Sequence, residues 1–191
     1  MKHVSGSRHR ARRGSTLLEF ALAGSFIFVP LLAGVSTVGM SALEAMQVVE
    51  LNRSAGHMFA TGVDFSQAAN RNLLIAVAGS LNITGAGGTG VIILSEIDGT
   101  GNNNAVCSRR LVIGNAALHT SNYVNPASNL IDAGGNVTNV NDPSANANGF
   151  TAMMPMAQGQ VNYLAETYFS TSNFDWIHFL TGTSIYAKAV F

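Results

Sequence analysis

The chain has 191 residues, the length of one modest domain, and its ten basic side chains balance its ten acidic side chains. A single cysteine, Cys107, excludes an intrachain disulfide and is expected to be a small buried apolar group. The five histidines lack the spacing of metal ligands and no nucleophile motif occurs, so the sequence predicts no metal site, no cofactor and no enzyme.

The charges are unevenly placed along the chain. Five basic side chains and no acidic one precede Gly14, whereas the rest of the chain has five basic and ten acidic side chains. A basic head of this kind could contact nucleic acid or anionic lipid, and the segment after it decides between them. Because that segment is apolar, we expect residues 1–14 to be a basic cytoplasmic leader and expect no nucleic-acid partner.

The apolar segment is long enough to cross a membrane. It contains 24 consecutive uncharged residues between Glu19 and Glu44. As a helix these residues extend roughly 36 Å at about 1.5 Å per residue, against a hydrocarbon core of about 30 Å. The sequence therefore predicts one membrane-spanning helix, with the basic head in the cytoplasm and the chain after about residue 44 across the membrane.

The helix is expected to continue beyond the membrane as an amphipathic stem, so that one helix covers residues 15–62. Residues 41–62 are rich in good helix formers. Pro30 is expected to kink the helix or to release one backbone hydrogen bond. The predicted apolar positions of the stem are Leu43, Met46, Val49 and Phe59.

A second, shorter helix is predicted after the stem. Asp64 is the expected N-cap, and the helix is expected to end at about Leu81. Its predicted apolar side consists of Phe65, Ala69, Leu73, Leu74 and Val77.

Two motifs resemble ligand sites but are better explained as turns. Residues 85–90 match G-x-G-x-x-G, yet a dinucleotide site needs a helix after this motif, and the strand-like VIILSEI follows instead. The run DGTGNNN, residues 98–104, begins like a calcium loop but lacks the further acidic ligands and the closing glutamate. We interpret both runs as turns.

Four β-rich runs are predicted to form a small antiparallel sheet. Residues 91–97 and 105–113 are expected to form a hairpin, and residues 160–169 and 184–191 are expected to be strands. Residues 115–149 hold nine asparagines together with glycine, serine and proline, which predicts an Asn/Gly-rich loop. The expected fold class is α+β, with an exported domain whose sheet packs on the helical stem, over residues 63–191.

The residues around Gly14 resemble the processing site of prepilins. RRGSTLLEF, residues 12–20, places arginines, a glycine, four further residues and a Glu-Phe pair directly before the apolar helix. This arrangement resembles the TadE/TadG-like minor pseudopilins of the tight-adherence (Tad, or Flp-type) pilus system. The strands VIILSEI, RRLVIGN, VNYLAETYF and YAKAVF are similar to those that this family carries after its long helix. The length of 191 residues resembles that of the family's minor subunits rather than that of its short main pilin.

The resemblance implies how the protein is processed and where it acts. A prepilin peptidase would cut between Gly14 and Ser15 on the cytoplasmic side, and Glu19 and Phe20 would act in recognition and packing. The mature chain would span the bacterial inner membrane once, with its C-terminal domain in the periplasm, or would be incorporated in a surface pilus. The implied partners are the prepilin peptidase, other pilus subunits and the inner-membrane pilus assembly machinery.

Two physical features of the segment agree with assembly through helix contacts. Cleavage would create an α-amine at Ser15 that is protonated at neutral pH, and the Glu19 carboxylate of a neighbouring subunit could meet it at low dielectric. Small side chains also let helices approach closely in a membrane. The predicted helix-packing positions are Ala21, Ser25, Ala33, Thr37 and Ser41.

A second interpretation is an uncleaved, single-pass anchored module on the cell envelope, whose sheet binds a ligand such as a cell-wall glycan. It accounts for the helix and for export but leaves the spacing of Gly14 and Glu19 to coincidence. A removable secretory signal peptide fits less well, because the apolar run is too long and the site around residues 40–42 is poor. The N-terminus of the mature chain distinguishes these interpretations.

Overall fold

The computed structural model describes residues 8–79, 81–170 and 184–191. The FDWIHFL run, predicted as part of a loop between the last two strands, lies outside these residues. By their contacts the residues group into two compact units, Met1–Ala42 and Leu43–Phe191.

A single long helix, α1 (Arg8–Ala60), contains all the described residues of the first unit and begins the second. The long N-terminal helix predicted from the sequence is therefore confirmed, and it begins upstream of the predicted start at residue 15. The helix is continuous through Pro30. Proline has no backbone N–H, so the carbonyl four residues before it loses its helical donor while the helix continues.

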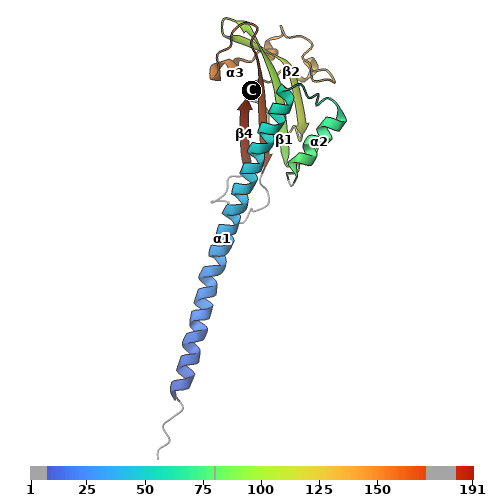
Figure 1. The fold of residues 1–191 in the computed structure, drawn as a ribbon. Helices are drawn as coiled ribbons and strands as arrows, with labels where there is room; N and C mark the ends of the chain where they lie inside the picture. The colour runs from blue at the N-terminus through green and yellow to red at the C-terminus, as the bar shows by residue number, and fades with distance from the viewer. Residues whose placement is uncertain (1–7, 80, 171–183) are drawn as a thin grey trace, which may run out of the picture. The chain divides into compact units, whose positions relative to one another are not determined.

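The second unit contains a four-stranded antiparallel sheet, which confirms the predicted α+β fold (Figure 1). The strand order is β2-β1-β3-β4, so β1 and β3 are the central strands. Central strands bury both faces, and β1 accordingly has an unbroken buried run from Val91 to Ser95. The four strands are β1 (Gly90–Gly101), β2 (Asn104–Gly114), β3 (Val161–Ser170) and β4 (Ser184–Val190).

The turn between β1 and β2 is tighter than the predicted loop. Asn102 and Asn103 alone join the paired ends of the two strands, and their φ angles are positive, 52° and 58°. Two successive left-handed residues are typical of a type I′ turn, which matches the twist of the strands, and asparagine tolerates this conformation well. Asp98 and Gly99 therefore lie within β1, and the hairpin is longer than predicted.

Helices α1 and α2 (Ala68–Ala78) cover one face of the sheet, called here the inner face (Figure 1). Gly56 is buried on α1, and a Cβ placed there would lie 2.8 Å from the Cβ of Ala165 on β3. The backbone of α1 therefore approaches β3 closely at this point. The core between helices and sheet contains Val48, Leu51, Ala55, Phe59, Phe65, Leu74, Ala78, Leu81, Ile83, Ile92, Leu94, Ile113, Ala165, Phe169 and Ala187.

The buried face of the stem differs from the predicted one. Of the predicted positions Phe59 is buried, whereas Leu43, Met46 and Val49 are exposed. Successive residues of a helix are rotated by about 100°, so these three positions lie about 80–160° around the helix from Phe59. The residues that do face the sheet are Val48, Leu51, Asn52, Ala55 and Phe59.

The second helix is shorter than predicted, and its core-facing side is rotated. Leu74 is buried, as predicted, and so is Ala78, whereas the predicted core positions Leu73 and Val77 are each 57 % exposed. The pairs 73/77 and 74/78 both have the four-residue spacing of a helix face, so the sequence pattern alone did not choose between them. Of the other predicted positions, Ala69 is exposed, and Phe65 is buried but precedes the helix.

The prediction that Asp64 caps the second helix is wrong. The N-cap of α2 is Gln67, which makes no side-chain capping bond. Asp64 instead accepts hydrogen bonds from the backbone N–H of Ser66 at 3.0 Å and from its hydroxyl at 2.9 Å, and it pairs with Arg109 on β2 at 2.5 Å. The hydrogen bonds from Ser66, followed by Arg109, lower the pKa of this carboxyl. Asp64 therefore fastens the connection between α1 and α2 to the sheet.

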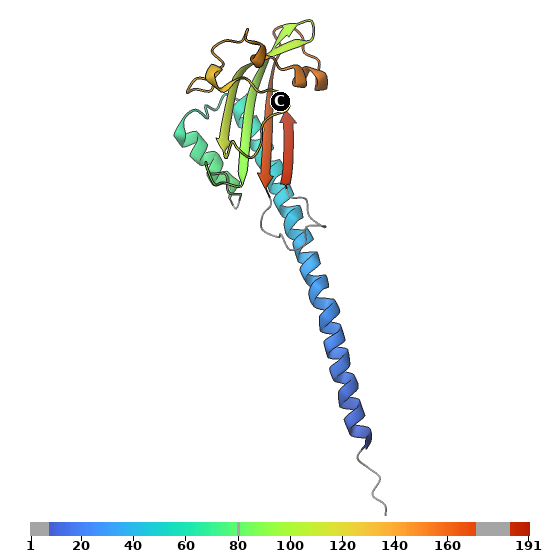
Figure 2. The same ribbon diagram turned by 180° about the vertical axis from the view of Figure 1, so that it is seen from behind.

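The opposite face of the sheet, the outer face, carries a second core near the β1–β2 turn (Figure 2). The Asn-rich segment supplies much of it and is bonded to the edge of β2. Arg110 N–H donates to the carbonyl of Gly135 at 2.7 Å, and Val137 N–H donates to that of Ser108 at 2.8 Å. Short elements in this segment are η1 (Ser128–Leu130), η2 (Pro143–Ala145) and α3 (Asn148–Met153). The second core contains Ile97, Ala105, Cys107, Val124, Val137, Ala145, Ala147, Phe150, Met156 and Leu164.

The thiol of Cys107 is fully buried in this second core, as predicted from the sequence. Burial raises its pKa from 9.0 to about 12, which lowers the thiolate fraction near neutral pH about 1,000-fold. Because the thiolate is the reactive form, we expect the folded chain to resist iodoacetamide at pH 8 and the urea-unfolded chain to react. Intact mass measured with and without urea checks this, and rapid modification of the folded chain would contradict the buried position.

Candidate functional site

The predicted processing residues lie in the first turns of α1. Gly14 and Ser15, of which the backbone alone is described, have helical conformation, and Glu19 and Phe20 follow in the same helix with exposed side chains. A peptide bond within a helix is held by backbone hydrogen bonds, so cleavage after Gly14 requires the helix to open from Arg8 onward. Helix ends open at the lowest free energy, so a site about two turns from the start is accessible.

Between Glu19 and Glu44 the surface of α1 is uncharged and largely apolar on every side. Phe26, Ile27, Phe28 and Val29 are consecutive, so they point in directions about 100° apart, and each is at least 62 % exposed. The large apolar side chains exposed in the first unit are Leu17, Leu18, Phe20, Leu22, Phe26, Ile27, Phe28, Val29, Leu31, Leu32, Val35, Val38 and Met40. A helix that is apolar all round is stable only when lipid or other helices surround it.

The free energy gained by covering these apolar side chains indicates that the helix does not remain exposed to water. Covering one such side chain contributes about 1.5–3 kcal/mol, so thirteen of them represent on the order of 20 kcal/mol or more. That exceeds the net stability of many domains, which is about 5–15 kcal/mol. Within the described residues, α1 is the one helix long and apolar enough to cross a membrane, from Thr16 onward. The chain therefore has a candidate membrane-spanning helix near its N-terminus, which fits single-pass membrane anchoring.

The predicted helix-packing residues form two bonded pairs along α1. The Ser25 hydroxyl donates to the carbonyl of Ala21 at 2.8 Å, and the Thr37 hydroxyl donates to that of Ala33 at 2.7 Å. These bonds satisfy both hydroxyls within the helix, which removes the penalty of placing them in hydrocarbon. Thr37 is buried, Ala33 and Ser41 are half-buried, and Ala21 and Ser25 are exposed. These contacts are all within one chain.

Glu19 lies about one helical turn after Ser15, the residue that follows the proposed cut. The two residues are four apart, so they lie on the same face of α1. Side chains of a helix lean toward its N-terminus, which directs the Glu19 carboxylate toward the turn that contains the Ser15 nitrogen. Phe20 is 78 % exposed and projects about 100° away from Glu19. A charged group and a large apolar group thus stand side by side at the boundary of the apolar segment.

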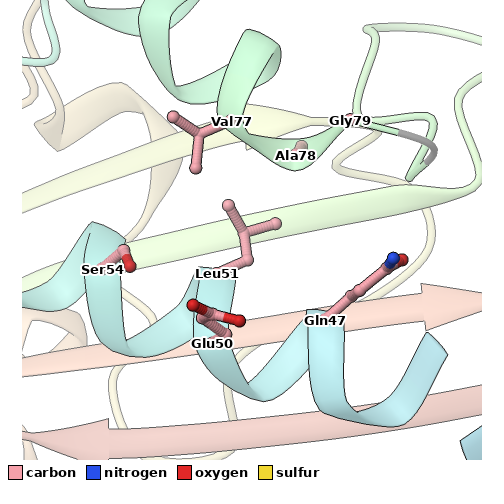
Figure 3. Close-up of a pocket in the computed structure, with 7 residues that line it drawn as sticks. All are labelled: Gln47, Glu50, Leu51, Ser54, Val77, Ala78 and Gly79. Atoms are coloured by element: carbon pink, nitrogen blue, oxygen red, sulfur yellow. The ribbon is translucent and has the colours of Figure 1, made fainter. Parts of the chain in front are cut away.

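The second unit has a shallow groove between α1 and α2 (Figure 3). In this view Leu51 points from α1 toward Val77 of α2, while Gln47 and Glu50 carry polar groups along the α1 side. Its volume is about 250 Å³, and it is lined by Gln47, Glu50, Leu51, Ser54, Val77, Ala78 and Gly79. Among the described residues, no group of three or more His, Cys, Asp or Glu side chains could hold a metal ion. The groove therefore offers packing surface without an evident chemical group.

One polar cluster on the outer face was not predicted from the sequence. Glu166 on β3 is 1 % exposed and accepts a hydrogen bond at 2.6 Å from the hydroxyl of Tyr186 on β4. His119, from the Asn-rich segment, stacks on Tyr168 with ring centroids 5.1 Å apart. The sequence did contain one indication of this buried carboxylate. Side chains alternate between the two faces of a strand, so Glu166 in VNYLAETYF lies on the same face as the apolar Leu164.

The residues of α1 near the N-terminus are thus the candidate functional segment of the chain. They combine an apolar surface, satisfied hydroxyls and a charged boundary at Glu19. The structure brings together Ser15 with Glu19, Ala21 with Ser25, and Ala33 with Thr37, each as a four-residue pair on one helix face. Comparisons of this chain with family models, curated proteins and solved structures found no match.

Proposed function

We propose that the protein is a membrane-anchored minor pseudopilin that a prepilin peptidase processes between Gly14 and Ser15 and that acts in assembly of a Tad-type adherence or secretion pilus. One observation carries this proposal. The prepilin-like motif stands at the start of a helix whose large apolar side chains are exposed on all sides from Leu17 to Met40. A motif of this length could arise by chance, but its position at a membrane boundary is the position that processing requires.

The proposed orientation follows from the distribution of charge. The head before Gly14 carries five basic side chains and no acid, so it stays in the cytoplasm by the positive-inside rule. The unit Leu43–Phe191 is then exported across the bacterial inner membrane. Its sheet and Asn-rich segment are available there to other pilus subunits, and the leader faces the peptidase.

Processing changes the charge at the membrane boundary. Hydrolysis of the Gly14–Ser15 amide consumes one water and leaves a carboxylate on Gly14 and a protonated amine on Ser15. The five basic side chains leave with the leader, so the new amine and Glu19 become the first charges of the mature chain. At low dielectric these opposite charges attract strongly, which favours neighbouring helices in the register that pairs them.

Glu19 is expected to act in assembly rather than in folding. In a Glu19→Gln variant the side chain keeps its size but loses its charge, so co-purification with other pilus subunits should fall by about tenfold or more, equivalent to about 1.4 kcal/mol. Quantitative mass spectrometry of pili or detergent-solubilised assemblies measures this. The matched control is Glu44→Gln, which removes a charge after the same apolar segment and should retain co-purification.

The mature N-terminus of the Glu19→Gln chain must be read in the same samples. Ser15 at the N-terminus with reduced co-purification places the role of Glu19 in assembly. A retained leader would place its role in peptidase recognition instead. Normal processing with normal co-purification would contradict the proposed ion pair.

A further inference from the structure

Two buried polar side chains, Ser95 and Glu166, and the half-buried Arg110 lie on the outer face of the sheet, on the side opposite α1 and α2. Ser95 on β1 pairs directly with Arg110 on β2, so their side chains project from the same face. Ser95 also pairs with Leu164 on β3, and Glu166 lies two residues further along the same face, diagonal to Ser95. Ser95 is 0 % exposed and Glu166 is 1 % exposed. Polar groups from three neighbouring strands therefore occupy adjoining positions, of which those of Ser95 and Glu166 are buried and that of Arg110 is half-buried.

Each of these three side chains has a buried atom without a hydrogen-bond partner among the described residues. The atoms are Ser95 Oγ, Arg110 Nε and Glu166 Oε2. Two further atoms of these side chains are bonded: Glu166 Oε1 accepts from the Tyr186 hydroxyl at 2.6 Å, and Arg110 Nη1 donates to Asn125 Oδ1 at 2.8 Å. Buried polar groups in folded proteins are nearly always bonded, and where protein partners are lacking ordered water supplies the bonds.

The charges of the cluster define what kind of molecule it would hold. Burial lowers the pKa of Arg110, and the neighbouring Glu166 carboxylate opposes this shift, so the two groups interact electrostatically. Among the described residues, however, Arg110 makes no ion pair with Glu166 within 4.0 Å. Because their opposite charges cancel, the cluster favours a small neutral molecule that both donates and accepts hydrogen bonds. We propose that at least one ordered water molecule bridges Glu166 Oε2, Ser95 Oγ and Arg110 Nε.

This hydration site lies where the strap, residues 115–125, is attached to the sheet. Asn125 accepts the bond from Arg110, and His119 stacks on Tyr168, which is two residues from Glu166 on the same face of β3. His119 Nε2 is a fourth buried atom without a partner among the described residues. Lys188, the β4 neighbour of Glu166, donates to the hydroxyl of Tyr123 in the strap at 2.5 Å. Arg110, which would hold this water, therefore also holds the strap on the sheet through Asn125.

Whether Ser95→Ala lowers or raises the melting temperature tests the hydration site. If water bridges the cluster, Ser95→Ala removes one of its partners, and the melting temperature of the full-length chain in detergent should fall by about 2–4 °C. If the site is dry, the same change removes a buried hydroxyl without a partner, and the melting temperature should stay the same or rise. The matched control is Ser184→Ala, which removes an exposed hydroxyl from the same sheet and should leave the melting temperature unchanged.

Two further measurements distinguish a bridging water from a simple packing effect. Glu166→Gln should also lower the melting temperature, and the double variant should fall less than the two single falls added together, because both changes remove partners of one water. A high-resolution experimental structure of the full-length chain should show a water oxygen within about 3.2 Å of at least two of the three atoms. Additive falls, an unchanged or higher melting temperature for Ser95→Ala, or a structure without this water would overturn the proposal.

Discussion

A Gly14→Val chain is expected to remain at full length in the membrane, while the wild-type chain loses its leader. The physical reason is the absence of a Cβ at glycine, which allows another backbone to approach the bond that is cut. Valine adds a branched side chain next to the Gly14–Ser15 amide and would displace it from the catalytic groups of the peptidase. Because displacement by about 1 Å can lower a rate about 10²-fold, we expect processing to fall at least that far. Co-expression with a prepilin peptidase, followed by intact mass measurement over time, checks this result.

The matched control for this variant is Gly24→Val, which changes a second glycine of the same helix. A Cβ at Gly24 would meet only the Phe28 ring, at 3.9 Å, so the helix accepts the larger side chain. Processing of this control should equal that of the wild type. Rapid removal of the leader from the Gly14→Val chain would show that the enzyme does not read this residue and would contradict the assigned cleavage site.

Replacing Gly56 with leucine is expected to destabilise the second unit. A Cβ at this position would lie 2.8 Å from the Cβ of Ala165, which is fully buried in the central strand β3. The rest of a leucine side chain has no room, so α1 must move away from the sheet and expose part of the inner core. Overpacking typically lowers the free energy of unfolding by about 1–3 kcal/mol, and the strand backbone beneath this site leaves little room to relax. Thermal unfolding of the full-length chain in detergent measures the loss.

The matched control for this second variant is Gly39→Leu, in the same helix. A Cβ at Gly39 would have no neighbouring atom within 4 Å, and leucine favours a helix over glycine by about 1 kcal/mol. This control should therefore retain or slightly gain stability. Equal stability of the two variants would show that α1 does not pack on β3 as closely as the structure places it.

The elements of this fold were predictable because they depend on local pattern. An uncharged run of 24 residues and alternating or continuous apolar strands are visible in any short window of the sequence. The helix and all four strands accordingly lie close to their predicted positions. The placement of β1 between β2 and β3 depends instead on pairing between segments far apart in sequence, and no local pattern specifies it.

The role of Asp64 shows why contacts were harder to predict than elements. An aspartate before a helical pattern is a typical N-cap, and the sequence supports that interpretation. Its partner Arg109 stands 45 residues further along the chain and reaches Asp64 only once β2 is in the sheet. The same limit applies to α2, where the choice between Leu73 and Leu74 as the core residue depends on where the sheet lies.

The residues of the candidate site were likewise predictable where they depend on local sequence and not where they depend on the fold. Gly14, Ser15, Glu19 and Phe20 all lie within one short segment of α1, so their helical arrangement follows from the sequence. The small residues at 21, 25, 33 and 37 were predicted for packing between helices, and the structure adds that each hydroxyl bonds to the carbonyl four residues before it. The buried cluster around Glu166 was missed because its members come from all four strands and from the strap.

The mature N-terminus of the wild-type chain tests the central claim most directly. The chain would be purified from the membranes of a bacterium with an active prepilin peptidase, and its intact mass and N-terminal peptide would be measured. The account predicts Ser15 as the first residue, with Glu19 at the fifth mature position. A chain that begins at Met1 would contradict the account and favour an uncleaved anchored module, and a chain that begins near residue 43 would identify the apolar helix as a removed signal peptide.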